Sequence, residues 1–277
     1  MKKILSTVLA AWLTLTSFEA QADYCFPTYN ETVGAETFIP SKVNYFTLSG
    51  IFGKAQMKQG TVKQDGWLYG ARGNFDIISP GTLYLGVESG YKYGNLTGKG
   101  IPIPPSIIIP ATKSQYSDFW GELRAGFTVG TTLNTSAIIS PYFVLGYEKE
   151  TDDFVSPSPI LLTHRLAYGY LGCGAVSSFY INPAMSIGLN GKLKWLFNAK
   201  SKIGGDPEIT DKNISCAGCF HWFIEMPFTY WISPNLSLAL APSYEYKNYD
   251  KHKFGFTGSE KATFHMWGGT IQLGYAY

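Results

Sequence analysis

Residues 83–94, LYLGVESGYKYG, decide the fold, because their side chains alternate between two kinds. Most of the apolar and aromatic residues share one parity, and most of the small or charged residues share the other: Leu83, Leu85, Val87, Tyr91 and Tyr93 against Tyr84, Gly86, Glu88, Gly90, Lys92 and Gly94. A strict period of two is that of a β-strand whose two faces meet different surroundings. This stretch therefore predicts a strand with one strongly apolar face.

The same alternation recurs along most of the chain. It is found in residues 67–76, 118–129, 187–197, 220–230, 236–247 and 267–277. In a soluble β-sandwich the second face meets water and carries many charges. Here that face is rich in Gly, Ser, Thr and Ala, which suits the narrow interior of a small barrel.

The composition supports a membrane-embedded β-protein. Aromatic residues make up 16% of the chain and charged residues 15%, against about 25% charge in an ordinary globular domain. Beyond the N-terminal segment, no apolar run reaches the ~18 residues that suggest a spanning helix. These features are typical of a transmembrane β-barrel, and a secreted β-sandwich is the alternative.

The connections alternate in length between the predicted strands. Four are short turns, at 78–81, 130–136, 181–184 and 233–235, and five others, mostly longer, lie at 58–65, 95–115, 150–162, 199–218 and 249–261. The predicted strands are 43–57, 66–77, 82–95, 116–130, 137–149, 163–180, 186–199, 218–231, 236–248 and 262–277. The sequence thus predicts an all-β fold, a single antiparallel transmembrane β-barrel of about ten strands. Eight or twelve strands are the alternatives, because 43–57 and 163–180 alternate least clearly.

The N-terminus has the pattern of a secretory signal peptide. Lys2 and Lys3 precede an apolar run, and Ala20 and Ala22 form an A-x-A cleavage pattern. We therefore expect a signal peptide at 1–22, a periplasmic or lumenal segment at 23–42 and the barrel at 43–277. An even strand number would place both ends of the mature chain in the periplasm of a Gram-negative cell envelope.

The charge balance gives no reason to expect nucleic acid as a partner. Cleavage after Ala22 would remove Lys2, Lys3 and Glu19, which leaves 20 basic and 19 acidic residues of the original 22 and 20. The expected partners are outer-membrane lipid, the barrel-assembly machinery and a host or envelope protein that meets the external loops.

Two segments resemble a known group of outer-membrane proteins. The strand PYFVLGYE at 141–148 and the aromatic terminus LGYAY at 273–277 resemble the small surface-antigen barrels of the opacity-protein and outer-membrane-protein-A β-domain type. The resemblance implies an outer-membrane barrel. It also implies that Tyr275 and Tyr277 belong to a terminal signal similar to the one that the barrel-assembly machinery reads.

The inward faces of the predicted strands carry both signs of charge. The residues expected in a lumen ion-pair network are Arg72, Asp76, Glu88, Lys92, Asp118, Glu122, Arg124, Glu148, Lys192, Lys194, Glu225, Glu245 and Lys247. Charges in a tight interior are costly unless they are paired, so a structural network is the first interpretation. The alternative is a narrow pore with a charged constriction.

An enzymatic site is a weaker hypothesis. The ten-stranded outer-membrane proteases, the omptins, place an Asp pair opposite an Asp-His pair at the barrel mouth. Asp152 and Asp153 fall in the third long connection here, and Asp250 and His252 fall in the fifth. The omptin Asp-x-His lies in the fourth loop and its Asp pair is spaced by one residue, so we expect no enzyme and assign no catalytic residue.

The cysteines and one connection complete the candidate sites. Cys216 and Cys219 form a C-x-x-C that predicts a local disulfide, and Cys25 and Cys173 are further candidates for pairing. No second ligand pair accompanies the C-x-x-C, so we expect no metal site and no cofactor. The connection at 101–110 contains Ile101, Ile103, Ile107, Ile108 and Ile109 among prolines, which exclude regular structure there. It is expected either to cover the barrel mouth or to contact a partner.

These observations predict a structural or surface-interaction barrel, adhesin- or antigen-like, with a largely packed lumen. A narrow, porin-like channel for small solutes is the alternative function, and an omptin-like surface protease is the lower alternative.

Overall fold

The structure is a computed structural model. It describes residues 44–59, 62–78, 83–99, 101–103, 107–109, 112–130, 137–156, 158, 163–182, 184–204, 219–233, 235–253 and 259–277. The predicted signal peptide at 1–22 and the segment at 23–42 lie outside these residues. In the described part of the chain, no helix is long and apolar enough to cross a membrane.

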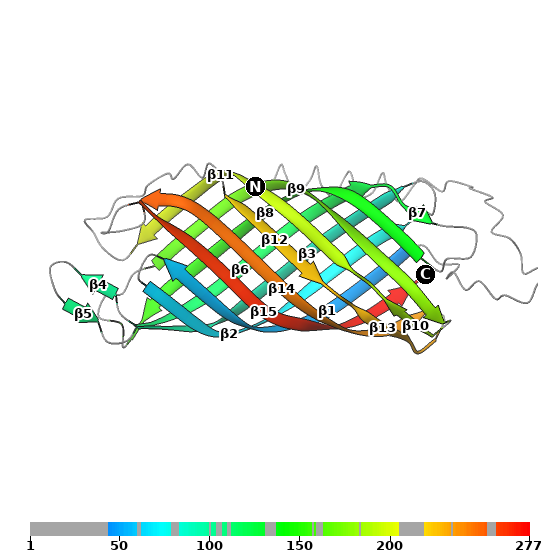
Figure 1. Ribbon diagram of the computed structural model, residues 1–277, viewed down its shortest axis with the longest axis horizontal. Coiled ribbons are helices and arrows are strands. Elements are labelled where there is room, and N and C mark those ends of the chain that lie inside the picture. Colours follow the sequence, from blue (N-terminus) through cyan, green and yellow to red (C-terminus); the bar gives the residue numbers. More distant parts are fainter. Residues whose placement is uncertain are drawn as a thin grey trace, which may run out of the picture. The chain divides into compact units, whose positions relative to one another are not determined.

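The described residues form antiparallel strands that close into a ring (Figure 1). The strands are β1 Asn44–Gln59, β2 Val62–Ile78, β3 Tyr84–Lys99, β4 Ile101–Ile103, β5 Ile107–Ile109, β6 Thr112–Gly126, β7 Val129–Gly130, β8 Ala137–Val155, β9 Thr163–Asn182, β10 Met185–Ile187, β11 Asn190–Gly204, β12 Phe220–Glu225, β13 Phe228–Trp231, β14 Leu236–Lys253 and β15 Ser259–Ala276. β1 pairs with both β2 and β15, so the sheet has no open edge there. Only β4 and β5 form a separate two-stranded sheet.

Three prolines explain why ten barrel strands are divided into more segments. The pairs β6 and β7, β10 and β11, and β12 and β13 are each one strand with a short break in its ladder. At the breaks the carbonyls of Pro141, Pro227 and Pro242 accept backbone hydrogen bonds of 3.2, 2.8 and 3.0 Å. Proline has no N–H to return the second bond, so the ladder is interrupted while the strand continues. The prediction of ten strands is therefore confirmed, including the two strands with the weakest alternation.

The register fixes the width of the barrel. A path that starts at Tyr45 in β1 and steps to the directly opposed residue of each next strand returns to β1 at Met57. The path is therefore offset by 12 residues (57 − 45) after one circuit of the ring. Over ten strands this offset corresponds to a strand tilt of about 40°. Such a barrel is only slightly wider than the eight-stranded kind that side chains fill.

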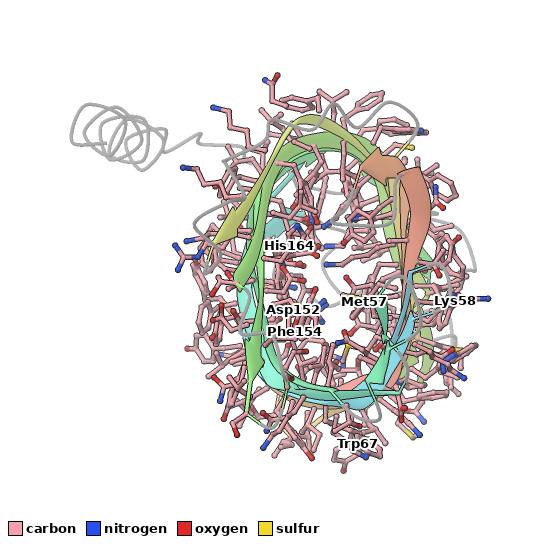
Figure 2. All side chains as sticks on the ribbon, turned by 90° about the vertical axis from the view of Figure 1, so that its left-hand side faces the viewer. Met57, Lys58, Trp67, Asp152, Phe154 and His164 are labelled. Carbon is pink, nitrogen blue, oxygen red and sulfur yellow. The ribbon has the colours of Figure 1, made fainter. Side chains whose placement is uncertain are left out.

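The two faces of the wall are the reverse of those in a soluble protein. Large apolar side chains point outward, with exposed fractions such as 77% for Phe143, 66% for Trp267 and 61% for Ile181. Charged side chains point inward and are buried. The end-on view shows Trp67 and Lys58 outside the ring and Asp152 inside it (Figure 2). A continuous apolar outer surface of this kind requires lipid, because water would leave it unstable.

Aromatic residues form a belt at each end of the outer surface. We call the end with Asn44 and Tyr277 the terminal end and the opposite end the loop end. The belt at the loop end is exposed on the outer face and contains Trp67, Tyr69, Tyr91, Tyr93, Tyr147, Trp195 and Trp267. The belt at the terminal end contains Phe46, Phe127, Phe179, Phe228, Tyr230, Tyr275 and Tyr277. Paired belts of this kind mark the two interfaces of a membrane.

The strands extend further toward the loop end than the sequence predicts, which shortens all five predicted loops. β8 continues to Val155, so Asp152 and Asp153 lie in a strand. β14 continues to Lys253 and includes Asp250 and His252. Residues 101–103 and 107–109 pair as β4 and β5, although we expected prolines to exclude strands there. Pro102 is tolerated because a two-stranded ladder leaves one edge without bonds.

Candidate functional site in the barrel lumen

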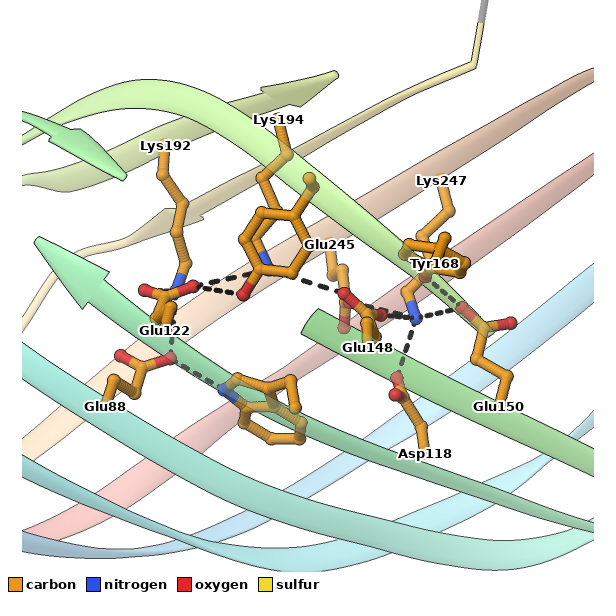
Figure 3. Close-up of polar contacts among 12 residues, drawn as sticks. Glu88, Asp118, Glu122, Glu148, Glu150, Tyr168, Lys192, Lys194, Glu245 and Lys247 are labelled. Atoms are coloured by element: carbon orange, nitrogen blue, oxygen red, sulfur yellow. Dashed lines mark hydrogen bonds and ion pairs between the residues drawn. The ribbon is translucent and has the colours of Figure 1, made fainter. Parts of the chain in front are cut away.

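Two clusters of charged side chains cross the lumen at mid-height. Each strand that supplies them alternates in and out, so its inward residues lie two apart, as do Glu122 and Arg124 in β6. The cluster nearer the terminal end, the terminal-side cluster, contains Arg72, Arg124, Lys192, Glu88, Glu122 and Glu225. The cluster nearer the loop end, the loop-side cluster, contains Lys92, Lys194, Lys247, Asp118, Glu148, Glu150 and Glu245. Figure 3 shows all of these except Lys92. All of these side chains except Glu245 are buried.

The terminal-side cluster joins opposite walls through two arginines and a lysine. Nη2 of Arg72 donates to both oxygens of Glu225, at 2.8 and 3.1 Å. Nη2 of Arg124 donates to Glu88 and lies 2.6 Å from Oε1 of Glu122. Nζ of Lys192 donates to the same two carboxylates, at 2.9 and 2.7 Å.

The loop-side cluster is centred on Lys247, whose side chain is fully buried. Its Nζ donates to Oδ2 of Asp118 at 2.6 Å, Oε1 of Glu148 at 2.5 Å and Oε1 of Glu150 at 2.8 Å. Oxygen atoms of these three carboxylates lie within 4.8 Å of one another, a spacing that suits a metal ion. In this barrel the lysine ammonium supplies the positive charge at that point.

Two further lysines connect the clusters and the walls. Nζ of Lys92 lies 3.1 Å from Oδ2 of Asp118 and 2.5 Å from Oε2 of Glu245. Nζ of Lys194 lies 3.5 Å from Oε2 of Glu122 and 3.4 Å from Oε2 of Glu148, so it contacts both clusters. The ion pairs from Arg124 to Lys247 form one continuous set across the lumen, and Arg72 and Glu225 form a separate pair beside it. Buried charges are tolerated only when they are paired and hydrogen-bonded in this way.

The structure places all thirteen residues of the predicted network in the lumen. Asp76 lies at its edge, where it accepts a hydrogen bond of 2.7 Å from the hydroxyl of Tyr84 and lies 4.0 Å from Nη1 of Arg124. Glu150 is not among the predicted residues, because the predicted strand ends at residue 149. Glu150 has the same parity as Glu148, so a predicted strand that ended one residue later would include Glu150 among the inward-facing residues.

Neutral side chains that complete the network were also missed. The hydroxyls of Tyr168 and Tyr249 both donate to Oε1 of Glu150 at 2.6 Å. The Tyr170 hydroxyl donates to Glu122 at 2.8 Å, and the Trp120 indole N–H donates to Glu88 at 2.8 Å. From the sequence alone, inward-facing aromatic residues are expected to pack in the interior. Only the three-dimensional structure shows that their polar atoms donate hydrogen bonds to the carboxylates.

Two cavities lie along the lumen on either side of the terminal-side cluster. One, of about 170 Å³, opens toward the terminal end and is lined by Tyr45, Tyr180 and Trp231 among others. The second, of about 50 Å³, lies between the clusters. Arg72, Glu88, Lys192 and Phe223 line both cavities and separate them. Each cavity is large enough to hold a few water molecules.

Of the four weak catalytic candidates, the structure describes the side chains of Asp152 and Asp153 alone, and these two do not face the same side of the wall. Asp152 and Asp153 are neighbours in a strand, so their side chains point to opposite faces of the wall, and only Asp152 is buried. Asp250 and His252 belong to β14, but their side chains lie outside the described part of the structure. The adjacent spacing of the two aspartates therefore excludes a joint role on one side of the wall.

The remaining predicted sites are only partly described. Cys173 is exposed on the outer face of β9 with a free thiol, and Cys219 is buried just before β12. Cys25 and Cys216 lie outside the described residues, so the disulfide between Cys216 and Cys219 stays a prediction. The isoleucines of β4 and β5 have no described side chains. Tyr275 and Tyr277 lie in the terminal belt, where their rings stack at 6.3 Å.

Comparisons with known proteins agree with this architecture. No protein-family model matches the sequence, and no curated protein matches it. Among solved structures, the outer membrane protease OmpT from Escherichia coli is similar with a TM-score of 0.56 and 10% identity, over 88% of this chain and 99% of that one. The translocator domain of the autotransporter NalP from Neisseria meningitidis matches with a TM-score of 0.45 and 10% identity, over 98% of each chain. Ail from Yersinia pestis matches with a TM-score of 0.33 and 11% identity, over 83% of this chain and 99% of Ail.

The closed ten-stranded ring, the apolar outer surface with two aromatic belts and the likeness to OmpT define the class: the chain is an outer-membrane β-barrel. The resemblance to small outer-membrane barrels that the sequence suggests is thereby confirmed. At 10% identity the likeness to OmpT concerns the fold, and it transfers no activity to this chain.

Proposed function

We propose that this protein is a closed barrel that serves as a structural or surface-interaction protein of the outer membrane, adhesin- or antigen-like. The observation that carries the proposal is the ion-pair network across the lumen. Its side chains meet from opposite walls, as Arg72 and Glu225 do, and aromatic rings fill the space around them. A barrel blocked in this way offers its loops, rather than its lumen, for function.

The loop end is the expected interaction surface. Longer connections emerge there, and β4 and β5 extend one of them as a separate two-stranded sheet. The isoleucines of this sheet remain our candidates for contact with a host or envelope protein. We propose that the signal peptide exports the chain and that both ends of the barrel chain face the periplasm, with the loops outside.

A narrow channel is the second candidate, and the two cavities favour it. They lie in line along the lumen and are separated only by the layer that contains Arg72 and Lys192. A movement of that layer would join them. Planar-bilayer recording of the purified, refolded protein distinguishes the two functions: a closed barrel gives no discrete openings, and reproducible openings would overturn it.

We propose no enzymatic activity. The opposite orientation of Asp152 and Asp153 supports this, because a protease that needs two carboxylates at one mouth cannot use them together. Incubation of the reconstituted barrel with a mixed peptide library, read by mass spectrometry, tests it. Specific cleavage that is lost in Asp250→Ala or His252→Ala would establish the protease instead.

A further inference from the structure

In the part of the chain that the structure describes, the lumen is filled at the loop end and open at the terminal end. Beyond the loop-side cluster, apolar side chains pack into the lumen, among them Leu68, Leu96 and Phe264, which are fully buried. On the other side of the terminal-side cluster lies the cavity of about 170 Å³ that opens toward the terminal end. The described residues therefore form a cup that a ligand enters from the side of the membrane where Asn44 and Tyr277 lie.

One side of this cup is lined by hydroxyl groups from β1, β9, β10, β13 and β14. They belong to Thr47, Ser178, Ser186, Thr229 and Ser237. None of these five hydroxyls hydrogen-bonds to another described residue. Each can donate one hydrogen bond and accept others, so together they suit a ligand that also carries groups of both kinds.

The register holds these hydroxyls close together. Ser186 and Thr229 are directly opposed, and Gly274 is directly opposed to Ser237 on one side and to Thr47 on the other. A Cβ at residue 274 would lie 2.5 Å from Oγ of Ser237 and 3.9 Å from Oγ1 of Thr47. A glycine inside a strand often marks a place that a ligand approaches closely, and here it keeps the space between two hydroxyls free.

The charges that line the cup balance one another. Three are basic and three are acidic: Arg72, Arg124, Lys192, Asp76, Glu88 and Glu225. Arg72 pairs with Glu225. Glu88 pairs with both Arg124 and Lys192, and Asp76 lies 4.0 Å from Nη1 of Arg124. A charged ligand would lose its hydration here without meeting a free counter-charge, so the cup favours a neutral ligand.

Aromatic rings stand at the mouth of the cup. The rings of Tyr45 and Trp231 meet edge to face, with their centroids 6.2 Å apart, and Tyr45 also hydrogen-bonds to Tyr180. All three residues line the cavity. Aromatic rings offer an apolar surface beside the hydroxyls, and this combination suits a ligand with an apolar C–H face and a polar edge.

The volume of the cup matches a single six-membered ring. A protein cavity of about 150 Å³ admits a benzene-sized ligand, and this one measures about 170 Å³ and is open at one end. A ligand that is neutral, has one ring, carries several hydroxyls and has an apolar face is a sugar unit.

We propose that the cup binds one neutral sugar ring, either as a free monosaccharide or as the end unit of a glycan. The hydroxyls of the sugar bond to Thr47, Thr229 and Ser237, and its C–H face packs on Trp231 at the mouth. The site goes beyond the proposed surface function, because it lies at the end opposite to the loops and requires no passage through the ion-pair network.

The test compares sugar binding by two variants that each lose three hydroxyls. Thr47→Val/Thr229→Val/Ser237→Ala removes three from the cup with little change of shape. Thr151→Val/Thr263→Val/Ser117→Ala, the control, removes the same kinds of hydroxyl from the outer face near the loop end. Each protein is reconstituted in phosphatidylcholine nanodiscs, and a heat-modifiability gel verifies that it is folded.

Saturation-transfer-difference NMR measures the dissociation constants of D-glucose and D-galactose. D-glucuronate and D-galacturonate serve as charged counterparts of the same rings. Maltose and lactose carry these rings as end units: if they bind as well as the monosaccharides, the cup admits the end of a glycan, and if they are excluded, it takes free sugar.

The expected result is that the unmutated protein binds at least one of the two neutral sugars, and binds its uronate about tenfold more weakly. The cup variant should bind that sugar at least about tenfold more weakly, because each lost hydrogen bond weakens binding severalfold, whereas the control variant should bind it as the unmutated protein does. Failure of both neutral sugars to bind would overturn the proposal. So would equal binding of the uronates, which needs no variant to measure, or an equal loss in the two variants.

Discussion

Arg72 and Glu225 join β2 to β12 across the lumen: Nη2 of Arg72 lies 2.8 and 3.1 Å from the two oxygens of Glu225, and both side chains are buried. These strands are not neighbours in the ring, so the pair acts as a cross-brace. Glu225 also accepts hydrogen bonds from Thr270 and Gln272 at 2.9 Å, which satisfies the carboxylate. The pair therefore spans the lumen without leaving an unpaired buried charge.

We expect removal of one partner to cost more than removal of both. Glu225→Leu leaves the Arg72 guanidinium buried without its carboxylate and should lower the free energy of unfolding by about 3–5 kcal/mol. Arg72→Met/Glu225→Leu should recover most of that loss, because no buried charge remains. Urea unfolding of the refolded barrel in lipid vesicles measures both values. A double variant that is no more stable than the single one would contradict the interpretation.

We expect the Lys247 ammonium to occupy the position that a metal ion could take among its three carboxylate partners. Lys247→Met leaves Asp118, Glu148 and Glu150 facing one another without their shared cation and should destabilise the barrel by about 3–5 kcal/mol. Millimolar Ca²⁺ should restore part of the loss, because the three carboxylates have a spacing that suits an oxygen-ligated cation. Thermal unfolding with and without Ca²⁺ measures the effect.

Lys92→Met is the matched control for this prediction. Lys92 also contacts Asp118, but Lys247 remains between the three carboxylates in that variant. It should be destabilised without a gain from Ca²⁺. If Ca²⁺ stabilises both variants equally, the ion binds elsewhere and the assignment of Lys247 is wrong.

Gly90 is expected to be a packing site for Trp120. A Cβ at residue 90 would overlap the Trp120 ring, whose indole N–H donates to Glu88. Gly90→Val should therefore cost about 1–3 kcal/mol through overpacking. Gly121→Val is the control, because nothing lies within 4 Å of a Cβ there. The difference between the two variants in urea unfolding reports the close approach, and equal stability of both would argue against it.

Cys173 provides a probe of lipid exposure. It lies on the outer face of β9 beside Phe143, its directly opposed residue, between the two aromatic belts. In vesicles it should react with a lipid-soluble maleimide and be protected from a charged methanethiosulfonate. Thr151→Cys in a Cys173→Ala background lies beyond Tyr147 and should react with both reagents. Rapid reaction of Cys173 with the charged reagent would place it outside the membrane.

The orientation of the barrel can be tested with inserted epitopes. A short tag placed in the 254–258 connection, between β14 and β15, should bind antibody on intact cells. The same tag placed at 131–136, between β7 and β8, should be detected only after the outer membrane is permeabilised. The opposite pattern would reverse the proposed topology, whereas the fold itself would stand.

The sequence predicts most of the fold because side-chain parity is a local property. In β3, the alternation of residues 83–94 already separates the outer from the inner face, and the structure leaves Tyr91 and Tyr93 exposed while it buries Glu88 and Lys92. Strand ends were less predictable. β8 and β14 continue beyond the aromatic belt with polar residues on both faces, so the contrast on which the prediction depends disappears there.

The sequence predicts which residues belong to the candidate site, but it does not predict which of them form ion pairs with one another. Parity identifies Lys247 and Asp118 as inward, yet they lie 129 residues apart in the sequence. Their contact depends on the 12-residue offset of the closed ring, which sets the residues of distant strands at the same height. No local sequence pattern predicts that Arg72 pairs with Glu225 instead of with Glu88, which is nearer in the sequence.

A β-bulge in β11 shows the same limit: the register shifts between Phe197 and Lys200, and Asn198 adopts a positive φ of 52°. A continuous alternation would place Lys200 and Lys202 in the lumen, and only the shifted register brings them outside. The sequence alone thus determined a ten-stranded barrel with an apolar outer face and a charged lumen, because a period of two follows from the strand itself. Tertiary structure decided which charges pair and which lysines leave the lumen, because ring closure and a single bulge relate residues that no local pattern connects.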